Sequence, residues 1–329
     1  MNIRRSWFRF IAFAQFTISS TRGGPLCGRN GELQRRGCGV IFLLVLTLFG
    51  DTLFAQYSPK ADWSAIEARI TSQITSGSTE QKRSALSEIR NLQTEKASRL
   101  AISALRDKDE IVRATAASSV VFLPKAEAII ALTPLLNDKA PFVRREAAYA
   151  LGNVGSSEAA APLLRLLQKE KQVEVRTASV VAFGQSGDPS AVQPLIQILK
   201  SRPKEETEFL RRSAARSIGQ IAQIISTGKC KVLTPQNFLP DKFKDITGEK
   251  DETVIAALSD FTDAVGILIQ VLKNKNESDD TRREAAFSLG AVSDKLALPA
   301  LQSSLNSTDP YLAEISREAI LKIERSLIK

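Results

Sequence analysis

The chain has 329 residues, of which 43% are apolar and only 6% aromatic. This content is ample for a large core, and the scarcity of aromatic residues favours packed helices over a β-sandwich. The formal net charge is +9, but residues 1–55 hold seven Arg and two acids, which leaves +4 for the remainder. So small a surplus does not indicate a nucleic-acid-binding protein. Of the three cysteines, only Cys230 lies beyond residue 55, so the remainder cannot form an internal disulfide.

The segment that ends at Ala55 has the order of a secretory signal peptide. A basic pair, Arg35-Arg36, precedes an apolar run from Val40 to Phe49. This run is roughly half the length that a membrane span requires before Asp51 interrupts it. We therefore expect cleavage after Ala55 and export to the periplasm or the exterior, with an uncleaved membrane anchor as the alternative. Residues 1–55 are interpreted as an N-terminal extension with this signal, and residues 56–329 as the folded domain.

One pattern recurs after residue 60: an aliphatic residue, a basic residue, a pair of small residues and another aliphatic residue, often followed by Gly. The copies begin at positions 112, 143, 175, 210, 281 and 315, so the intervals are 31, 32, 35, 71 and 34 residues. Within a copy the apolar and small residues are three or four apart and share one helical face. A second helix precedes each copy. Each unit is thus a helical hairpin that buries its faces only by stacking on its neighbours.

The clearest copies are Arg144–Gly152 (RREAAYALG) and Arg282–Gly290 (RREAAFSLG). They resemble the HEAT repeat, in the short variant of the phycobilisome-lyase-like proteins, and the resemblance covers residues 61–329. It implies an all-α fold, a right-handed α-solenoid (α-α superhelix) of about seven hairpins.

An acid lies six residues before the repeat Arg in four units. The pairs are Asp107 and Arg113, Asp138 and Arg144, Glu170 and Arg176, and Glu205 and Arg211. The resemblance implies that such acids lie in the turn within each hairpin and link stacked units through the Arg. We expect a structural role for these residues, because a buried guanidinium requires a carboxylate partner.

The interval of 71 residues indicates an insertion in the solenoid at about residues 224–250. From Ile224 to Lys250 the sequence has turn-forming residues and interleaved Lys without a helical period, and from Val254 the spacing predicts one long helix. Because long loops are often functional, Lys242, Phe243 and Lys244 are candidate partner-binding residues. An insertion that is merely tolerated is the alternative.

The chain contains no His, which argues against His-based acid–base catalysis, Ser-His-Asp triads and most transition-metal sites. Deoxyhypusine hydroxylase is built from similar repeats, and its iron ligands come from His-Glu pairs. At those positions this chain has Arg145-Glu146, Arg283-Glu284 and Arg317-Glu318, so we expect that oxygenase chemistry to be absent. We accordingly expect that the protein is not an enzyme and that it has no catalytic or metal-binding residue, no cofactor and no small-molecule substrate.

The leading hypothesis is a non-catalytic scaffold or adaptor that binds a protein or peptide partner outside the cytoplasm. The second Arg of each basic pair would form a basic stripe if it faces outward, which makes Arg145, Arg212 and Arg283 candidate contacts. Two alternatives remain open. One is a phycobilin-lyase-like or other enzyme-associated HEAT protein, and the other is a protein that binds nucleic acid or another polyanion through the paired Arg.

Overall fold

The computed structural model describes residues 63–228 and 259–327, and every regular element in these ranges is a helix. The α-helices are α3 (Trp63–Ser76), α4 (Thr79–Leu92), α5 (Glu95–Leu100), α6 (Glu110–Ser119), α7 (Lys125–Leu132), α8 (Pro141–Val154), α9 (Ala160–Lys169), α10 (Val173–Ser186), α11 (Val192–Lys200), α12 (Glu208–Thr227), α13 (Ser259–Lys273), α14 (Asp279–Val292), α15 (Leu298–Ser304) and α16 (Pro310–Leu327). Short 3-10 helices extend several of them: η1 (Ile102–Arg106), η2 (Thr133–Asn137), η3 (Ser157–Ala159), η4 (Pro189–Ala191), η5 (Glu205–Thr207) and η8 (Lys295–Ala297).

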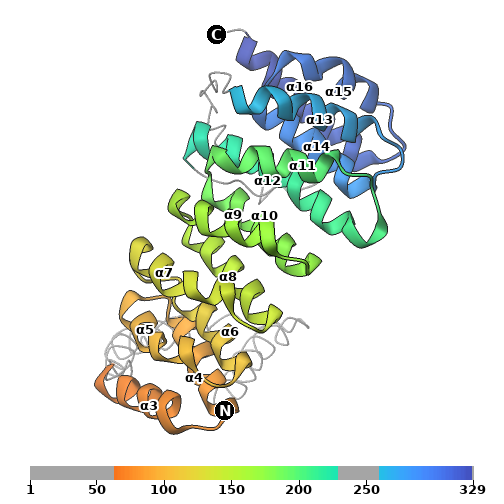
Figure 1. The fold of residues 1–329 in the computed structure, drawn as a ribbon. Coiled ribbons are helices and arrows are strands. Elements are labelled where there is room, and N and C mark those ends of the chain that lie inside the picture. The colour runs from red at the N-terminus through yellow and green to blue at the C-terminus, as the bar shows by residue number, and fades with distance from the viewer. Residues whose placement is uncertain (1–62, 229–258, 328–329) are drawn as a thin grey trace, which may run out of the picture. The chain divides into compact units, whose positions relative to one another are not determined.

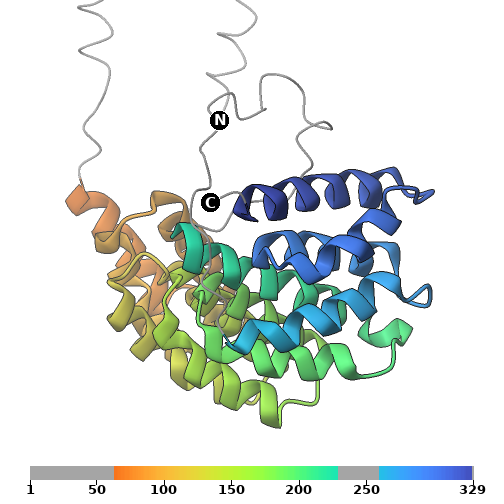
Figure 2. The same cartoon turned by 90° about the horizontal axis from the view of Figure 1, so that it is seen from above.

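The fourteen α-helices of residues 63–228 and 259–327 pair into seven hairpins that stack in chain order, from α3 with α4 to α15 with α16 (Figure 1). The even-numbered helices form one layer, in which each packs against the next, and the odd-numbered helices cover it (Figure 2). The buried residues of the two layers form one continuous hydrophobic cluster from Ile70 to Ile323. The predicted all-α solenoid of about seven hairpins is thereby confirmed.

The insertion follows α12, and the stacking continues on its far side, since α12 packs directly against α14. The expected loop does not begin at Ile224, because α12 continues to Thr227. There the Ile224 side chain lies against Gly187, and Gly228, with a φ of 71°, ends the helix in the left-handed conformation. Residues 229–258, which include Lys242, Phe243, Lys244 and Cys230, lie outside the described residues. In α13 the predicted apolar positions Phe261, Val265, Leu268 and Leu272 are buried.

Glycine allows the even-numbered helices to approach one another closely. A Cβ at Gly290 of α14 would lie 2.8 Å from Cα of Ala319 on α16. A Cβ at Gly219 of α12 would lie equally close, 2.8 Å, to Cα of Ser288 on α14. Because backbone cannot move aside as a flexible side chain can, the glycine that ends each repeat pattern sets the spacing of this layer.

Ion pairs between successive turns, here called rungs, join one hairpin to the next. In each rung a basic side chain of one even-numbered helix binds the carboxylate in the following turn. The described rungs are Lys82–Asp107, Arg113–Asp138, Arg144–Glu170, Arg211–Glu277 and Arg283–Asp309.

The rung of Arg113 shows how one side chain ties two turns. Its Nε and Nη2 donate to the two carboxylate oxygens of Asp138 at 2.7 and 2.9 Å. Its Nη1 donates to the carbonyl oxygen of Asp107, in its own turn, at 2.8 Å. The Asp138 carboxylate also accepts the backbone N–H of Ala140 at 2.9 Å, which fixes the second turn. Arg144 repeats the same contacts with Glu170 and the carbonyl of Asp138.

Three of the rung carboxylates, those of Asp138, Glu170 and Asp309, have lowered pKa values that favour the charged state. Burial by itself raises the pKa of Asp138, but the hydrogen bonds from Arg113 and Ala140 outweigh burial, and the pKa is lowered overall. Glu170 and Asp309 show the same lowered pKa for the same reasons, with Arg144 and Arg283 as their partners.

No described helix has the length and apolarity needed to cross a membrane. The candidate signal segment before Ala55 lies outside the described residues, as do residues 1–62 as a whole.

We predict that Gly290→Ala lowers the stability of the protein by about 1–3 kcal/mol, because the new methyl group would meet the backbone of Ala319. The midpoint of urea unfolding, followed by far-UV circular dichroism, measures the effect. The matched control is Gly266→Ala in α13, where nothing lies within 4 Å of the added Cβ. That substitution should raise the midpoint, because alanine is the better helix former. Equal shifts in the two variants would contradict the close approach of α14 and α16.

We predict that Asp138→Asn destabilises the protein at pH 7 by about 3 kcal/mol, because Arg113 is left buried without its carboxylate. The lowered pKa of Asp138 means that its contribution is complete above the unfolded-state pKa and is lost as pH falls through the folded-state pKa. The difference between variant and wild type should therefore shrink in acid. Glu88→Gln, which breaks the exposed Arg69–Glu88 pair, is the control and should change the unfolding midpoint little. A difference that does not depend on pH would contradict this account of the rung.

Candidate functional site

The second arginines of the basic pairs have carboxylate partners. Arg145 binds Glu146 at 2.9 Å and stacks on the ring of Phe142, with 4.9 Å between the guanidinium carbon and the ring centroid. Arg212 binds Asp280 at 2.7 Å and stacks on Phe209 at 4.6 Å. Their side chains are 35% and 33% exposed. The guanidinium groups are thus held against the solenoid by an acid and an aromatic ring.

Arg283 corrects the expectation that the first Arg of each pair makes the rung and the second faces outward. Arg282 donates from Nε to the carbonyl oxygen of Leu272 at 3.1 Å and pairs with Asp279. These contacts hold Arg282 near the end of α13, so Arg283 reaches Asp309 at 2.7 Å and forms the rung.

Glu205 is a second correction, since it does not pair with Arg211. It lies exposed in η5, within a longer turn than those of the neighbouring units. Arg211 instead donates to the carbonyl oxygens of Ile198 and Leu199 and to the Ser201 hydroxyl, and its carboxylate partner is Glu277. The acid that pairs with Arg211 thus lies beyond the insertion, 66 residues along the chain.

Arg176 occupies the rung position of α10 but has no carboxylate partner among the described residues. Its Nε is buried and makes no hydrogen bond there. Glu170, the acid expected to pair with it, binds Arg144 of the preceding unit. The rung partner of Arg113 is 25 residues further along and that of Arg144 is 26. The corresponding positions after Arg176 are Ser201 and Arg202, so the sequence supplies no acid.

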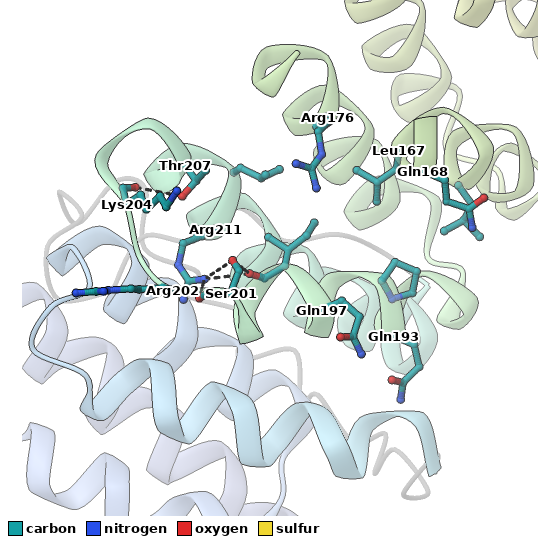
Figure 3. A pocket seen from close by; sticks show the side chains of 14 residues that line it. Leu167, Gln168, Arg176, Gln193, Gln197, Ser201, Arg202, Lys204, Thr207 and Arg211 are labelled. Carbon is teal, nitrogen blue, oxygen red and sulfur yellow. Dashed lines mark hydrogen bonds between the residues drawn. The ribbon is translucent and has the colours of Figure 1, made fainter. Parts of the chain in front are cut away.

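A cavity of about 690 Å³ lies beside Arg176, between α9 and α11. Its apolar lining includes Leu164 and Leu167 of α9 and Pro194 of α11. In Figure 3 the Arg176 side chain extends from α10 into this space, between Leu167 and Thr207 in the view, with Gln193 and Gln197 on the α11 side. Dashed lines join Arg211 to Ser201, and none reaches Arg176. The lining thus combines apolar side chains with polar and basic ones.

Glu284 is the described carboxyl group with a raised pKa. Its side chain is 13% exposed, its Oε1 accepts from Nη1 of Arg216 at 3.1 Å, and its Oε2 is buried without a partner. Burial raises its pKa, and the nearby charges of Arg216 and Arg212 offset only part of that rise. Such a group retains its proton to higher pH than an ordinary glutamate, as a general acid does.

The residues at the positions where the resemblance to deoxyhypusine hydroxylase implied iron ligands do not fit iron. Arg145 and Arg283 carry guanidinium groups, which are not metal ligands, and each is bound to a carboxylate. Arg317 pairs with Glu314 in the same way. Within residues 63–228 and 259–327, no group of three or more acids and cysteines is placed to hold a metal ion.

The cavity at Arg176 was missed in the sequence because the six-residue spacing does not show which arginine each turn acid binds. The sequence does mark the missing acid, at the residue that follows the odd-numbered helix of each hairpin or the 3-10 helix that extends it. Asp107, Asp138 and Glu170 occupy this place in three consecutive units, and Ser201 replaces them in the next.

Comparison with known families identifies the repeats. The pattern described as HEAT repeats matches residues 67–149 and 131–219, and that described as PBS lyase HEAT-like repeat matches residues 281–307. Together these matches cover more than half of the chain.

The chain is 25% identical over 270 residues to deoxyhypusine hydroxylase-B of Oryza sativa subsp. japonica, covering 74% of this chain and 87% of that enzyme. Two similar solved structures are the complex of CpcE and CpcF of phycocyanin lyase from Nostoc sp. PCC7120 and human deoxyhypusine hydroxylase in complex with glycerol. The first is 20% identical and covers 80% of this chain and 92% of that chain, with a TM-score of 0.44. The second is 20% identical and covers 80% of this chain and 96% of that chain, with a TM-score of 0.34.

The similarity to an enzyme along most of that enzyme's length overturns two expectations, the non-catalytic scaffold and the absence of an enzymatic role. The expectation of a protein or peptide partner stays a prediction, which the extended surface of a solenoid suits. By its repeats, the chain belongs to the HEAT repeat proteins of the phycobilisome-lyase-like type.

Proposed function

We propose that this chain is an enzyme-associated HEAT protein that holds a small organic substrate in the cavity beside Arg176. The similarity to a hydroxylase over most of that enzyme's length supports an enzymatic role. The guanidinium groups of Arg145 and Arg283, which stand where iron ligands were considered, favour chemistry other than iron-dependent hydroxylation. We therefore assign substrate binding, rather than metal chemistry, to the described residues.

The cavity is the observation that carries this proposal. Its volume of about 690 Å³ lies within the range of small-molecule sites, roughly 300–1,000 Å³. Leucine and proline side chains line it, and the amides of Gln168, Gln193 and Gln197 provide donors and acceptors at its edges. Such a lining suits a molecule with an apolar body and a few polar groups.

We predict that the full chain, purified from the cells that produce it, carries a small molecule that native mass spectrometry detects and denaturation releases. The variant Gln197→Trp should lack this molecule, because Gln197 is exposed on α11 and an indole there fills the cavity. Gln302→Trp, at an exposed position of α15 away from the cavity, is the matched control and should retain it.

The reaction itself is tested by supplying the released molecule to an extract of cells that lack the chain. Conversion of the molecule should be restored by the wild-type protein and by Gln302→Trp, but not by Gln197→Trp. Conversion of the molecule in the presence of all three proteins, or of none of them, would contradict the proposal.

We also propose that this reaction takes place outside the cytoplasm. The basic pair, the apolar run and the small residue at Ala55 support export of the chain. N-terminal sequencing of the protein from the cell envelope or medium should find Gln56 as the first residue. A mature protein that retains Arg35-Arg36 would refute cleavage at this site.

A further inference from the structure

Arg176 is the exception in a series of rungs. Each of the five described rungs satisfies its basic side chain with a carboxylate from the following turn. At Arg176 the corresponding turn begins with Ser201, whose hydroxyl and carbonyl oxygens accept from Arg211 instead. The guanidinium of Arg176 therefore has the position of a rung without the acid that completes one.

The surroundings of Arg176 favour an anion. No acid lines the cavity, whereas Arg202, Lys204 and Arg211 do. The charge of Arg211 is already matched by Glu277. Lys204 makes only an exposed contact of 3.7 Å with Glu206, and Arg202 extends away from the other lining side chains in Figure 3. Arg176 is half-buried, its Nε is fully buried, and no described carboxylate neutralises its charge.

The neighbouring rung shows what occupies such a position when the acid is present. A second cavity, of about 420 Å³, adjoins Asp138, Arg144 and Glu170. There Nε and Nη2 of Arg144 donate to the two carboxylate oxygens of Glu170 at 2.7 and 3.1 Å. The rung position thus presents a guanidinium fork to a carboxylate, the geometry in which this pair is strongest.

We propose that the cavity binds an organic acid, with the carboxylate of the ligand on Arg176 in place of the missing turn acid and its apolar body against Leu164, Leu167 and Pro194. This inference rests on the proposed function and names the chemical class of its substrate. The ligand completes the interrupted series, so its binding also ties the hairpin of α9 and α10 to that of α11 and α12.

The first experiment compares two probes of equal shape, 4-phenylbutyrate and its neutral amide, by isothermal titration calorimetry with the full chain. The acid should bind at least tenfold more tightly than the amide, because only the acid offers a carboxylate to Arg176. Arg176→Gln should remove this difference, and Arg176→Lys should keep part of it. Arg144→Gln, which breaks a complete rung, should leave the affinity for the acid unchanged while lowering thermal stability.

The second experiment supplies the missing acid within the chain. Ser201→Asp places a carboxylate 25 residues after Arg176, as Asp138 lies 25 residues after Arg113. Ser201→Asp should melt at a higher temperature than Ser201→Asn and should no longer bind 4-phenylbutyrate. The gain should vanish in the double variant Arg176→Gln, Ser201→Asp, which separates a bond to Arg176 from one to Arg211.

Several results would overturn the inference. They are equal affinity for acid and amide, no binding of the acid, undiminished binding by Arg176→Gln, and no gain of Ser201→Asp over Ser201→Asn. If inorganic phosphate binds as tightly as 4-phenylbutyrate, the site is a general anion site, and the assignment to organic acids is wrong. If Gln197→Trp blocks both probes while Arg176→Gln affects neither, the cavity still binds small molecules, and only the carboxylate inference fails.

Discussion

The bond between an arginine and the carboxylate of the next turn is the interaction on which this solenoid depends. Arg113 and Arg144 each bond to the backbone of their own turn and to the acid of the following one, so a single side chain sets the register of two hairpins. Because charge buried without a partner is costly, the pair holds only when both turns are correctly placed. Apolar packing between the helices specifies the register far less strictly, because apolar contacts tolerate rearrangement.

This constraint explains how the chain accommodates its insertion. Arg211 reaches Glu277 across 66 residues, where other rungs span 25 or 26. Closing a longer loop adds only a slowly growing entropic cost, while the contact at its ends is the same as in an uninterrupted unit. α14 therefore stacks on α12 as its neighbours stack on each other, with Gly219 against Ser288. The repeat period is broken in the sequence but not in the packing.

The sequence predicts the helices well, because the spacing of alanines, aliphatic residues and glycines reports the face that each helix buries. It predicts the rungs less well, because spacing along the chain does not reveal a partner in space. Glu205 has the expected separation from Arg211 but lies exposed in η5. Arg282 and Arg283 are adjacent in the sequence, and only their contacts distinguish the one that reaches Asp309. The special place of Arg176 became visible only once its neighbours were seen to pair forward along the chain.

The same reasoning bears on the similarity to a hydroxylase. At the positions where the resemblance implied His-Glu pairs, this chain has arginine beside glutamate, and the arginines bind carboxylates. These positions have thus become ties within and between hairpins, and a residue that secures the stacking is not free to bind a substrate. A ligand is better placed where a tie is absent. Among the rung positions in the described parts of the chain, Arg176 is the guanidinium without a carboxylate, and it adjoins a cavity of about 690 Å³. The missing carboxylate at Arg176 would weaken a purely structural solenoid. A ligand that supplies a carboxylate there would restore the tie and stabilise the fold.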